Sequence, residues 1–430
     1  LIMLLHFKRG SLFLFFLFIQ NFVFSQLVLP FAGGGIWPGE NKKATAASLR
    51  PLVITTDKNG NTYAFDNSYG VIRKISSDSM ITTFAGNGIV GYTGDSSDAL
   101  NASIDASGGM ATDINGNLYF SDINNRVIRK IDEKNKITTI AGLGTWPFEG
   151  SLASKSNISP TLLALDSNGN TFFYDQAYNV IRKIDSVGKI STIAGNGQYG
   201  YTGDSGLAVK AKISVNGLAV DNKGNIFFTD GSNDVIRRIT RSGIISTIAG
   251  VGSAGYNGDT INAKTAKLDY PRSIDIDYSG NIYFTDEGNN RVRKINKDGI
   301  ITTLIGSATK SFSGDGGKAN NATINYPASI KVDKLGNIYF FDKSNYRIRK
   351  ISTNGIISTV AGNGTQGNSG DGGAAVNAQL GYTIYIALDN NMNLVLLDQS
   401  YGIIKKINSN GIISNFISNI TYGDINIDLD

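Results

Sequence analysis

The feature that most constrains this sequence is a unit of about thirty residues that recurs seven times. Residues 277–306, DYSGNIYFTDEGNNRVRKINKDGIITTLIG, are its fifth copy. The copies keep an almost constant spacing and begin at Asp57, Asp113, Asp166, Asp221, Asp277, Asp333 and Asp389. A fixed period near fifty is typical of repeat architectures, so the repeat determines how every shorter motif is interpreted.

Each copy holds four short runs that favour β-strands. In the fifth copy the runs lie at residues 273–276, 282–285, 291–295 and 300–305, and turn-forming residues fill 277–281, 286–290 and 297–299. The runs are rich in Ile, Val, Thr, Tyr and Phe, whereas Gly, Asn and Asp occupy the turns. No copy shows helical periodicity over ten residues. Each copy therefore predicts a four-stranded antiparallel meander.

A single meander of this size cannot bury both of its faces, whereas stacked copies can. Runs such as IYFT and FFY are apolar on both faces, as expected of a sheet held between two others. We therefore predict an all-β fold, a single β-propeller of seven four-stranded antiparallel blades. Six or eight blades are the alternatives, and a β-solenoid is the second choice of fold. The expected repeat cores lie near residues 52–86, 108–142, 161–195, 216–250, 272–306, 328–362 and 384–418.

The amino-terminal residues have the pattern of an export signal. An apolar run at residues 12–24 follows Lys8 and Arg9 and ends in small residues. This predicts a secretory signal peptide at residues 1–25, with a buried core helix as the alternative, and a propeller at 27–430. We expect a secreted protein, extracellular or periplasmic, with no membrane insertion after the signal is removed. Residues 27–32 resemble an isolated fourth strand and are expected to act as an outer clasp, unless the sequence is a fragment of a longer protein.

The composition excludes several kinds of chemistry. The chain has no Cys, and its one histidine, His6, lies in the expected signal. A Ser-His-Asp triad, a thiol nucleophile and a His-bearing zinc site are therefore excluded. Carboxylate, Tyr or Arg chemistry and a calcium ion with oxygen ligands stay open. Removing Lys8 and Arg9 leaves 38 basic and 35 acidic residues, and this near balance gives no support for nucleic-acid binding.

The repeated elements GN-(I/L/T)-(Y/F)-F-x-D, N-x-(V/I)-R-K-I and G-I-I-(S/T)-T-(I/V/L)-A-G resemble the NHL-repeat β-propellers, notably their bacterial extracellular members. The loop GYTGDSSDALNASI at residues 91–104 is similar to the glycine-rich loop that those repeats often carry. The resemblance implies a propeller, although that family is best known with six blades. It implies no single function, because the family includes enzymes, receptors and RNA binders.

Residues present in every copy are interpreted as structural. The second run ends in an aspartate, and a basic residue follows seven positions later. If a two-residue turn joins the second and third strands, each acid lies directly opposite its base as a structural pair. The pairs are Asp66 and Arg73, Asp122 and Arg129, Asp175 and Arg182, Asp230 and Arg237, Asp286 and Arg293, Asp342 and Arg349, and Asp398 and Lys405. The DxxGN motifs of the first turns predict Asx-type turns rather than calcium loops.

Residues that differ between copies are the better candidates for a site. In a propeller the linkers between blades share a face with the second turns, so aromatic and amide side chains should collect there. The candidate ligand-binding residues are Trp37, Tyr69, Trp146, Tyr178, Asn233, Asn289, Asn345 and Tyr401. Packing of the loops on themselves is the alternative.

These residues predict a non-catalytic, monomeric binding or scaffold module for a protein or carbohydrate ligand. No catalytic residue, metal site or cofactor is predicted. The alternative function is a carboxylate- or calcium-dependent lyase or hydrolase at the central channel. Three or more acidic residues at one channel mouth, without Arg or Lys among them, would favour that enzyme.

Overall fold

The computed structural model describes residues 40–417 except 45, 46, 48, 143–149, 151, 167, 389–392, 399 and 402. All described residues belong to one compact unit, Pro38–Asp430. The expected signal peptide at residues 1–25 and the expected clasp at 27–32 lie outside the described residues. Within the described part, no helix has the length and apolar character needed to cross a membrane.

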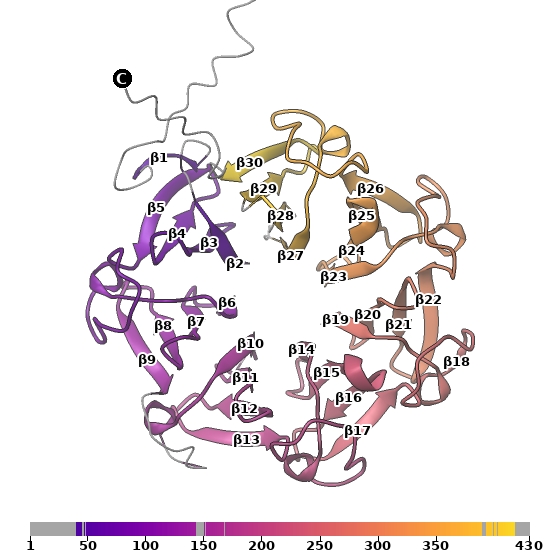
Figure 1. The fold of residues 1–430 in the computed structure, drawn as a ribbon, viewed down its shortest axis with the longest axis horizontal. Coiled ribbons are helices and arrows are strands. Elements are labelled where there is room, and N and C mark those ends of the chain that lie inside the picture. Colours follow the sequence, from indigo (N-terminus) through magenta and orange to yellow (C-terminus); the bar gives the residue numbers. More distant parts are fainter. Residues whose placement is uncertain are drawn as a thin grey trace, which may run out of the picture. The chain divides into compact units, whose positions relative to one another are not determined.

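Seven antiparallel sheets form a ring, with the first strand of each sheet toward the centre and the fourth at the rim (Figure 1). Blade 1 holds β2 (Pro51–Thr56), β3 (Thr62–Asp66), β4 (Val71–Ile75) and β5 (Met80–Ala85). Blade 2 holds β6 (Met110–Thr112), β7 (Leu118–Asp122), β8 (Val127–Ile131) and β9 (Ile137–Gly142). Blade 3 holds β10 (Pro160–Leu165), β11 (Thr171–Asp175), β12 (Val180–Ile184) and β13 (Ile190–Ala194).

The remaining four blades follow the same order. Blade 4 holds β14 (Gly217–Val220), β15 (Ile226–Asp230), β16 (Val235–Ile239) and β17 (Ile245–Ala249). Blade 5 holds β19 (Pro271–Ile276), β20 (Ile282–Asp286), β21 (Arg291–Ile295) and β22 (Ile300–Gly306). Blade 6 holds β23 (Pro327–Val332), β24 (Ile338–Asp342), β25 (Arg347–Ile351) and β26 (Ile357–Ala361). Blade 7 holds β27 (Thr383–Leu388), β28 (Leu394–Asp398), β29 (Ile403–Ile407) and β30 (Ile413–Ile417).

The all-β propeller of seven four-stranded blades is therefore confirmed, and the six- and eight-bladed alternatives are wrong. In blade 5 the third strand agrees with its predicted run, and the first strand begins two residues earlier than predicted, at Pro271. The first turns are Asx turns as predicted. In blade 1, for example, the Asp57 carboxylate accepts the backbone N–H groups of Asn59 and Asn61 at 2.9 Å each.

The linker that leaves each blade crosses the rim of the next blade and covers its outer edge. The segment before blade 1 adds a short fifth strand, β1 (Lys42–Lys43), to β5, and the linker between blades 4 and 5 adds β18 (Ile261–Asn262) to β22. Covered edges cannot template pairing with another chain. Single 3₁₀ turns occur in linkers or second turns, at η2 (Ala99–Asn101), η3 (Ala153–Lys155), η4 (Ala208–Lys210), η5 (Gly231–Asn233), η6 (Ala263–Thr265), η7 (Ala319–Asn321), η8 (Lys343–Asn345) and η9 (Ala375–Asn377).

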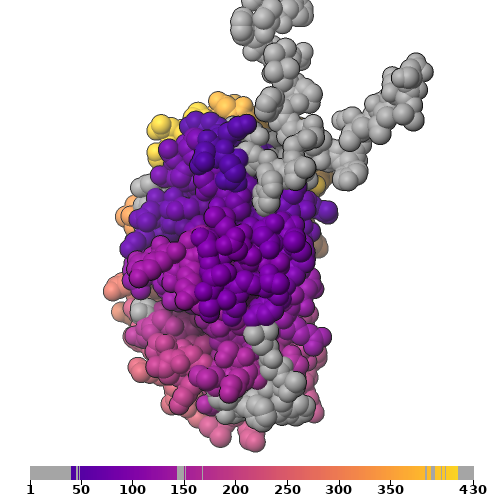
Figure 2. Space-filling view, turned by 90° about the vertical axis from the view of Figure 1, so that its left-hand side faces the viewer, coloured from indigo at the N-terminus to yellow at the C-terminus, as the bar shows by residue number. Residues whose placement is uncertain are grey.

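The core lies between the blades rather than inside any one of them. Each second strand is buried along its whole length, and its apolar side chains pack on both neighbouring sheets. The ring closes in the same way, because Ile54 of blade 1 packs with Val395 and Leu397 of blade 7. The hydroxyl of Thr56 donates to the Leu388 carbonyl at 3.1 Å across this junction. Figure 2 shows the indigo surface of blade 1 beside the yellow surface of blade 7.

Candidate functional site

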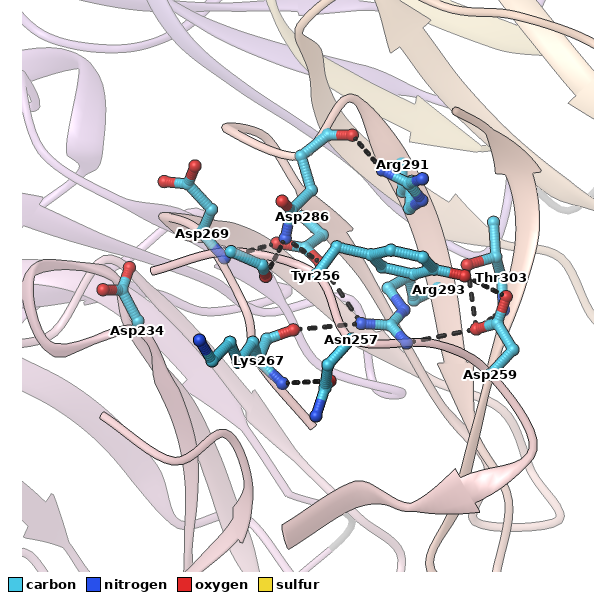
Figure 3. A network of polar contacts seen from close by, with 12 residues as sticks. Asp234, Tyr256, Asn257, Asp259, Lys267, Asp269, Asp286, Arg291, Arg293 and Thr303 are labelled. Atoms are coloured by element: carbon cyan, nitrogen blue, oxygen red, sulfur yellow. Dashed lines mark hydrogen bonds and ion pairs between the residues drawn. The ribbon is translucent and has the colours of Figure 1, made fainter. Parts of the chain in front are cut away.

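In six of the blades a basic residue of the third strand anchors the segment that leads into that blade, as Figure 3 shows for Arg293 in blade 5. The guanidinium of Arg293 is fully buried and donates to the Gly258 carbonyl at 2.8 Å and to Asp259 at 3.1 Å. The Tyr256 ring stacks 5.0 Å from that guanidinium. Asp259 also accepts the backbone N–H of Thr303, at 2.7 Å, from the fourth strand. One arginine thus ties the linker to the two outer strands of its blade.

Other blades repeat this arrangement, so it is structural. Each linker acid is an aspartate that directly follows a glycine, as in Gly258-Asp259, except in blade 1, where Glu40 takes the role. The pairs are Arg73 and Glu40, Arg129 and Asp95, Arg237 and Asp204, Arg293 and Asp259, Arg349 and Asp315, and Lys405 and Asp371.

The predicted register of the acid and the base within a blade is wrong. Four residues rather than two form the turn between the second and third strands, so Asp286 lies opposite Arg291 and Arg293 lies opposite Phe284. Asn290 takes a left-handed conformation, φ 53°, at the end of this turn. The acid and its predicted base are therefore diagonal neighbours. They still form ion pairs, at 2.8 Å between Asp175 and Arg182 and at 3.5 Å in blade 5.

Burial dominates the titration of these second-strand aspartates. Removal from water raises the pKa of Asp286 to about 6, although backbone hydrogen bonds and Arg293 favour its charged form. The same cause raises the pKa of Asp66, Asp122 and Asp342 to about 6 and that of Asp230 to about 7. A raised pKa often marks a catalytic acid, but here a buried structural network accounts for it in blade after blade.

The structure places the predicted site amides inside this network. The amide nitrogen of Asn289 donates to Asp286 at 2.9 Å and to the linker carbonyl of Gly255 at 2.7 Å. Asn345 bonds in the same way in blade 6, and Asn233 donates to Asp230 in blade 4. These amides therefore join the second turns to their own blades and to the linkers. Their role in binding a ligand stays a prediction.

The predicted aromatic site residues are less uniform. Tyr69, Tyr178 and Tyr401 are half-buried at the second turns of blades 1, 3 and 7. The aromatic ring of Tyr178 lies 5.6 Å from the Arg182 guanidinium. The three tyrosines lie in different blades of the propeller. Trp37 and Trp146 lie outside the described residues.

A second polar cluster differs between copies and was missed by the sequence reasoning. It lies on the linker face, which we define as the side where the second turns lie and the first strands begin. Glu287, the first residue of the second turn in blade 5, is bonded to Arg272 of β19 and to Lys343 of blade 6, at 3.2 Å each. The Glu287 side chain is 8% exposed, whereas that of Arg272 is 42% exposed. We call these three residues with Tyr382 the mouth cluster.

Tyr382 completes the mouth cluster from blade 7. Its ring lies 4.8 Å from the Lys343 ammonium. Burial opposes the charge of Lys343, but the Tyr382 hydroxyl and the Glu287 carboxylate outweigh it and raise the pKa of Lys343. The lysine is therefore held charged between Glu287, which also binds Arg272 of β19, and Tyr382, which directly precedes β27.

Three tyrosines line this part of the linker face at equivalent positions of successive copies, namely Tyr270, Tyr326 and Tyr382. Each directly precedes the first strand of its blade. Tyr270 and Tyr326 have left-handed φ angles of 50° and 53°, which is uncommon for bulky residues. Their backbone N–H groups donate at 2.9 Å to Asp234 and Asn290 of the preceding blades. We call the three residues the tyrosine arc.

The arc is partly exposed and carries further charge. Tyr270 is 42% exposed and Tyr326 is 37% exposed. The Lys310 ammonium donates to the Tyr326 hydroxyl at 2.7 Å and lies 4.4 Å from its ring. At the same place blade 1 has Arg50 and blade 3 has Ser159, so the arc is confined to blades 5 to 7.

The sequence does contain the signal for this site, in position-by-position differences between copies. The second turns begin with Asn67, Ile123, Gln176, Gly231, Glu287 and Lys343 in blades 1 to 6. Only blades 5 and 6, among these six, have an acid at this position followed by a base at the same position of the next copy. Within the described residues, no three Asp or Glu side chains are grouped closely enough to hold a metal ion.

This geometry defines a class of protein, a β-propeller whose blades share one structural network. One face of it carries a copy-specific cluster of aromatic and charged residues. A family profile described as the teneurin NHL domain matches residues 252–313 and 309–366. The chain is 28% identical to human Teneurin-1 over 284 residues, which is 56% of this chain and 10% of that protein. It is 34% identical to human Teneurin-4 over 172 residues, 35% of this chain and 6% of that protein. These matches confirm that the repeats of this seven-bladed propeller resemble those of the NHL-repeat β-propellers.

The aligned part spans about a tenth of the length of Teneurin-1. Among solved structures, a streptogramin B lyase aligns over 86% of this chain and 94% of its own, with a TM-score of 0.54 and 16% identity. A catalytically inactive His-to-Ala variant of virginiamycin B lyase from Staphylococcus aureus, solved with quinupristin, covers 83% of this chain and 94% of its own, with a TM-score of 0.52 and 17% identity. At these identities the likeness concerns the fold alone.

Proposed function

We propose that this chain is an exported, non-catalytic binding module that engages a protein partner through its linker face. The observation that supports it best is the tyrosine arc beside the mouth cluster. Both are confined to three of the seven blades, whereas residues repeated in every blade stabilise the ring. The arc and cluster together are the site that we assign to the partner.

The chemistry of the site suits a protein interface. Tyr and Arg are enriched among the residues that dominate binding energy at such interfaces, because they combine large contact area with hydrogen bonding. The backbones of Tyr270 and Tyr326 are held by hydrogen bonds before a partner binds, so less conformational freedom is lost on binding. Arg272 is positioned by the buried Glu287 and keeps an exposed guanidinium.

The same geometry argues against the enzymatic alternative. The carboxylate of Glu287 is bonded to two bases, whereas a carboxylate-dependent enzyme would need acidic groups free of such partners at the channel mouth. One protein of similar fold, the virginiamycin B lyase, is catalytically inactive when a histidine is replaced by alanine. The single histidine of this chain, His6, lies in the expected signal.

The test is a binding screen of residues 26–430 against purified cell-surface proteins and glycans, with and without a chelator, followed by affinity measurements on variants. Tyr326→Ala and Arg272→Ala should each weaken binding roughly thirtyfold, the loss expected for interface residues worth about 2 kcal/mol. Tyr278→Ala is the matched control, since Tyr278 is 92% exposed in the first turn of blade 5, at the other ends of the strands.

Chelator-insensitive binding of a protein that depends on Tyr326 and not on Tyr278 would support the proposal. Binding of glycans and of no protein would show that the partner is a polysaccharide and not a protein. Chelator-sensitive breakdown of any ligand would overturn the non-catalytic assignment, and equal losses in Tyr326→Ala and Tyr278→Ala would place the site elsewhere.

A further inference from the structure

A pocket of about 300 Å³ lies between blades 3 and 4, at their first turns. The first turns are at the other ends of the strands from the second turns, so this pocket is separate from the mouth cluster. Its floor is apolar and includes Phe172, Ile226 and Ile239. Its rim includes Leu207 and Val209 of the linker, which are 54% and 37% exposed. The volume is at the lower end of the range for small-molecule sites.

At this pocket, blade 3 lacks a tyrosine that blades 1, 2 and 5 carry at the equivalent position. In blades 1, 2 and 5 a tyrosine hydroxyl donates to the carboxylate of the first turn, from Tyr63 to Asp57, from Tyr119 to Asp113 and from Tyr283 to Asp277, at 3.0–3.2 Å. Blade 3 has Phe172 at this position, so no hydroxyl reaches Asp166 from there.

The missing hydroxyl leaves the Asp166 carboxylate with spare capacity to accept a hydrogen bond. Its Oδ1 accepts the backbone N–H groups of Asn168 and Asn170 at 2.9 Å, and from the described residues its Oδ2 accepts only the Asn170 amide, at 2.6 Å. The equivalent Oδ2 of Asp277 accepts both an amide, at 2.7 Å, and the tyrosine hydroxyl. A ligand hydroxyl could therefore take the place of the tyrosine hydroxyl at Asp166.

Neighbouring side chains make the pocket basic and keep it open. Lys183, Lys223 and Arg241 line it with Asp166, which gives three positive charges and one negative charge. At the equivalent interface of blades 1 and 2, Phe84 packs edge-on against Tyr63, with ring centroids 4.9 Å apart, where blade 3 has Ile193 and Phe172. The aspartate that caps η2, Asp98, is replaced in η4 by Leu207.

We propose that this inter-blade pocket binds a small organic acid that has an apolar body and a hydroxyl group. The acid group lies among Lys183, Lys223 and Arg241, where a carboxylate is favoured by charge-assisted hydrogen bonds. The apolar body covers Leu207, Val209 and the floor. The hydroxyl donates to Oδ2 of Asp166 in place of the tyrosine hydroxyl of blades 1, 2 and 5.

Three small molecules that all contain a benzene ring test the proposed roles of the hydroxyl and of the acid group. They are 4-hydroxyphenylacetate, phenylacetate without the hydroxyl, and tyramine with an ammonium in place of the acid. Binding to residues 26–430 is measured by isothermal titration calorimetry and by ligand-observed NMR. We expect 4-hydroxyphenylacetate to bind roughly tenfold more tightly than either other probe, as one charged or buried hydrogen bond predicts.

Variants locate the binding. Arg241→Ala should weaken 4-hydroxyphenylacetate binding about tenfold. Lys297→Ala, at the same turn position of blade 5, is the matched control and should change nothing. Phe172→Tyr, which restores the residue of blades 1, 2 and 5, should abolish the preference for the hydroxylated probe. Phe227→Tyr makes the same change in blade 4 and should leave binding intact.

Circular dichroism of each variant confirms that the ring is folded. Absence of binding by wild type at 10 mM probe, about the limit for a specific small-ligand site, would overturn the proposal. Equal affinity for all three probes, or equal loss in Arg241→Ala and Lys297→Ala, would also overturn it. Because this site is separate from the linker face, its failure leaves the proposed protein-binding function untouched.

Discussion

Replacing Arg293 with methionine should destabilise the ring more than almost any other single change. The buried guanidinium is bonded to the carbonyls of Lys267 and Gly258 and to the carboxylates of Asp259 and Asp286. Methionine is flexible and fills much of the vacated volume, so the main loss is electrostatic. Asp286, with no exposed surface, would stay buried without its base.

The structure sets the size of this loss. Removing one partner of a buried ion pair typically costs about 3–5 kcal/mol, because an uncompensated charge is left behind. Removing both partners costs less, so Arg293→Met/Asp286→Leu should recover about 2 kcal/mol or more of that loss. Lys294→Met is the control, because Lys294 points to the opposite face, with its ammonium 5.4 Å from the Tyr283 ring, and should cost under about 1 kcal/mol.

The assay is urea unfolding at pH 7.5, followed by tyrosine fluorescence and by circular dichroism. Wild type, Arg293→Met, Asp286→Leu, the double variant and Lys294→Met are compared at equal concentration. A loss below about 1 kcal/mol for Arg293→Met would show that this arginine does not anchor the linker. Additive losses in the double variant would show that Arg293 and Asp286 do not act as a pair.

Three further predictions concern pH and the backbone. Burial raises the pKa of Asp286 to about 6 and that of Asp230 to about 7, so the folded state binds these protons more tightly than the unfolded state. The melting temperature should therefore rise as the pH is lowered from 7.5 to 5.5. A fall over this range would contradict the prediction. Gly306→Ala should cost at least about 2 kcal/mol more than Gly299→Ala in urea unfolding. Both glycines have positive φ angles, 99° and 76°, but only at Gly306 would the added Cβ collide with the Asn290 carbonyl, because Gly299 faces open space. Asp277→Ala removes the acceptor of the Asn281 amide and the Tyr283 hydroxyl and should lower stability by about 1–3 kcal/mol, with Tyr278→Ala as a neutral control.

The strands and first turns were predictable because their determinants are local. Turn residues such as Gly280 and Asn281 follow each other directly in the sequence, and alternating apolar residues determine which runs pack between sheets. The second turn was predicted too short because its length depends on Asn290 adopting a left-handed conformation, which the sequence does not specify. The error displaced the expected Asp286 and Arg293 pairing by two residues.

The linker anchor and the mouth cluster depend on contacts between blades. Asp259 binds Arg293, 34 residues later, because its linker crosses the rim of the next blade. No local sequence pattern predicts the course of that linker. Glu287 and Lys343 belong to different copies and meet only because neighbouring second turns share a face. Comparison of equivalent positions across copies would have identified them, together with Tyr270, Tyr326 and Tyr382.

The central claim is that copy-specific residues bind a partner while repeated residues stabilise the ring. Hydrogen–deuterium exchange of residues 26–430, with and without the partner found by the screen, tests it most directly. We expect new protection confined to the second turns of blades 5 and 6 and to the residues that precede β19, β23 and β27. Protection spread evenly over all seven blades, or confined to blades 1 to 3, would contradict it.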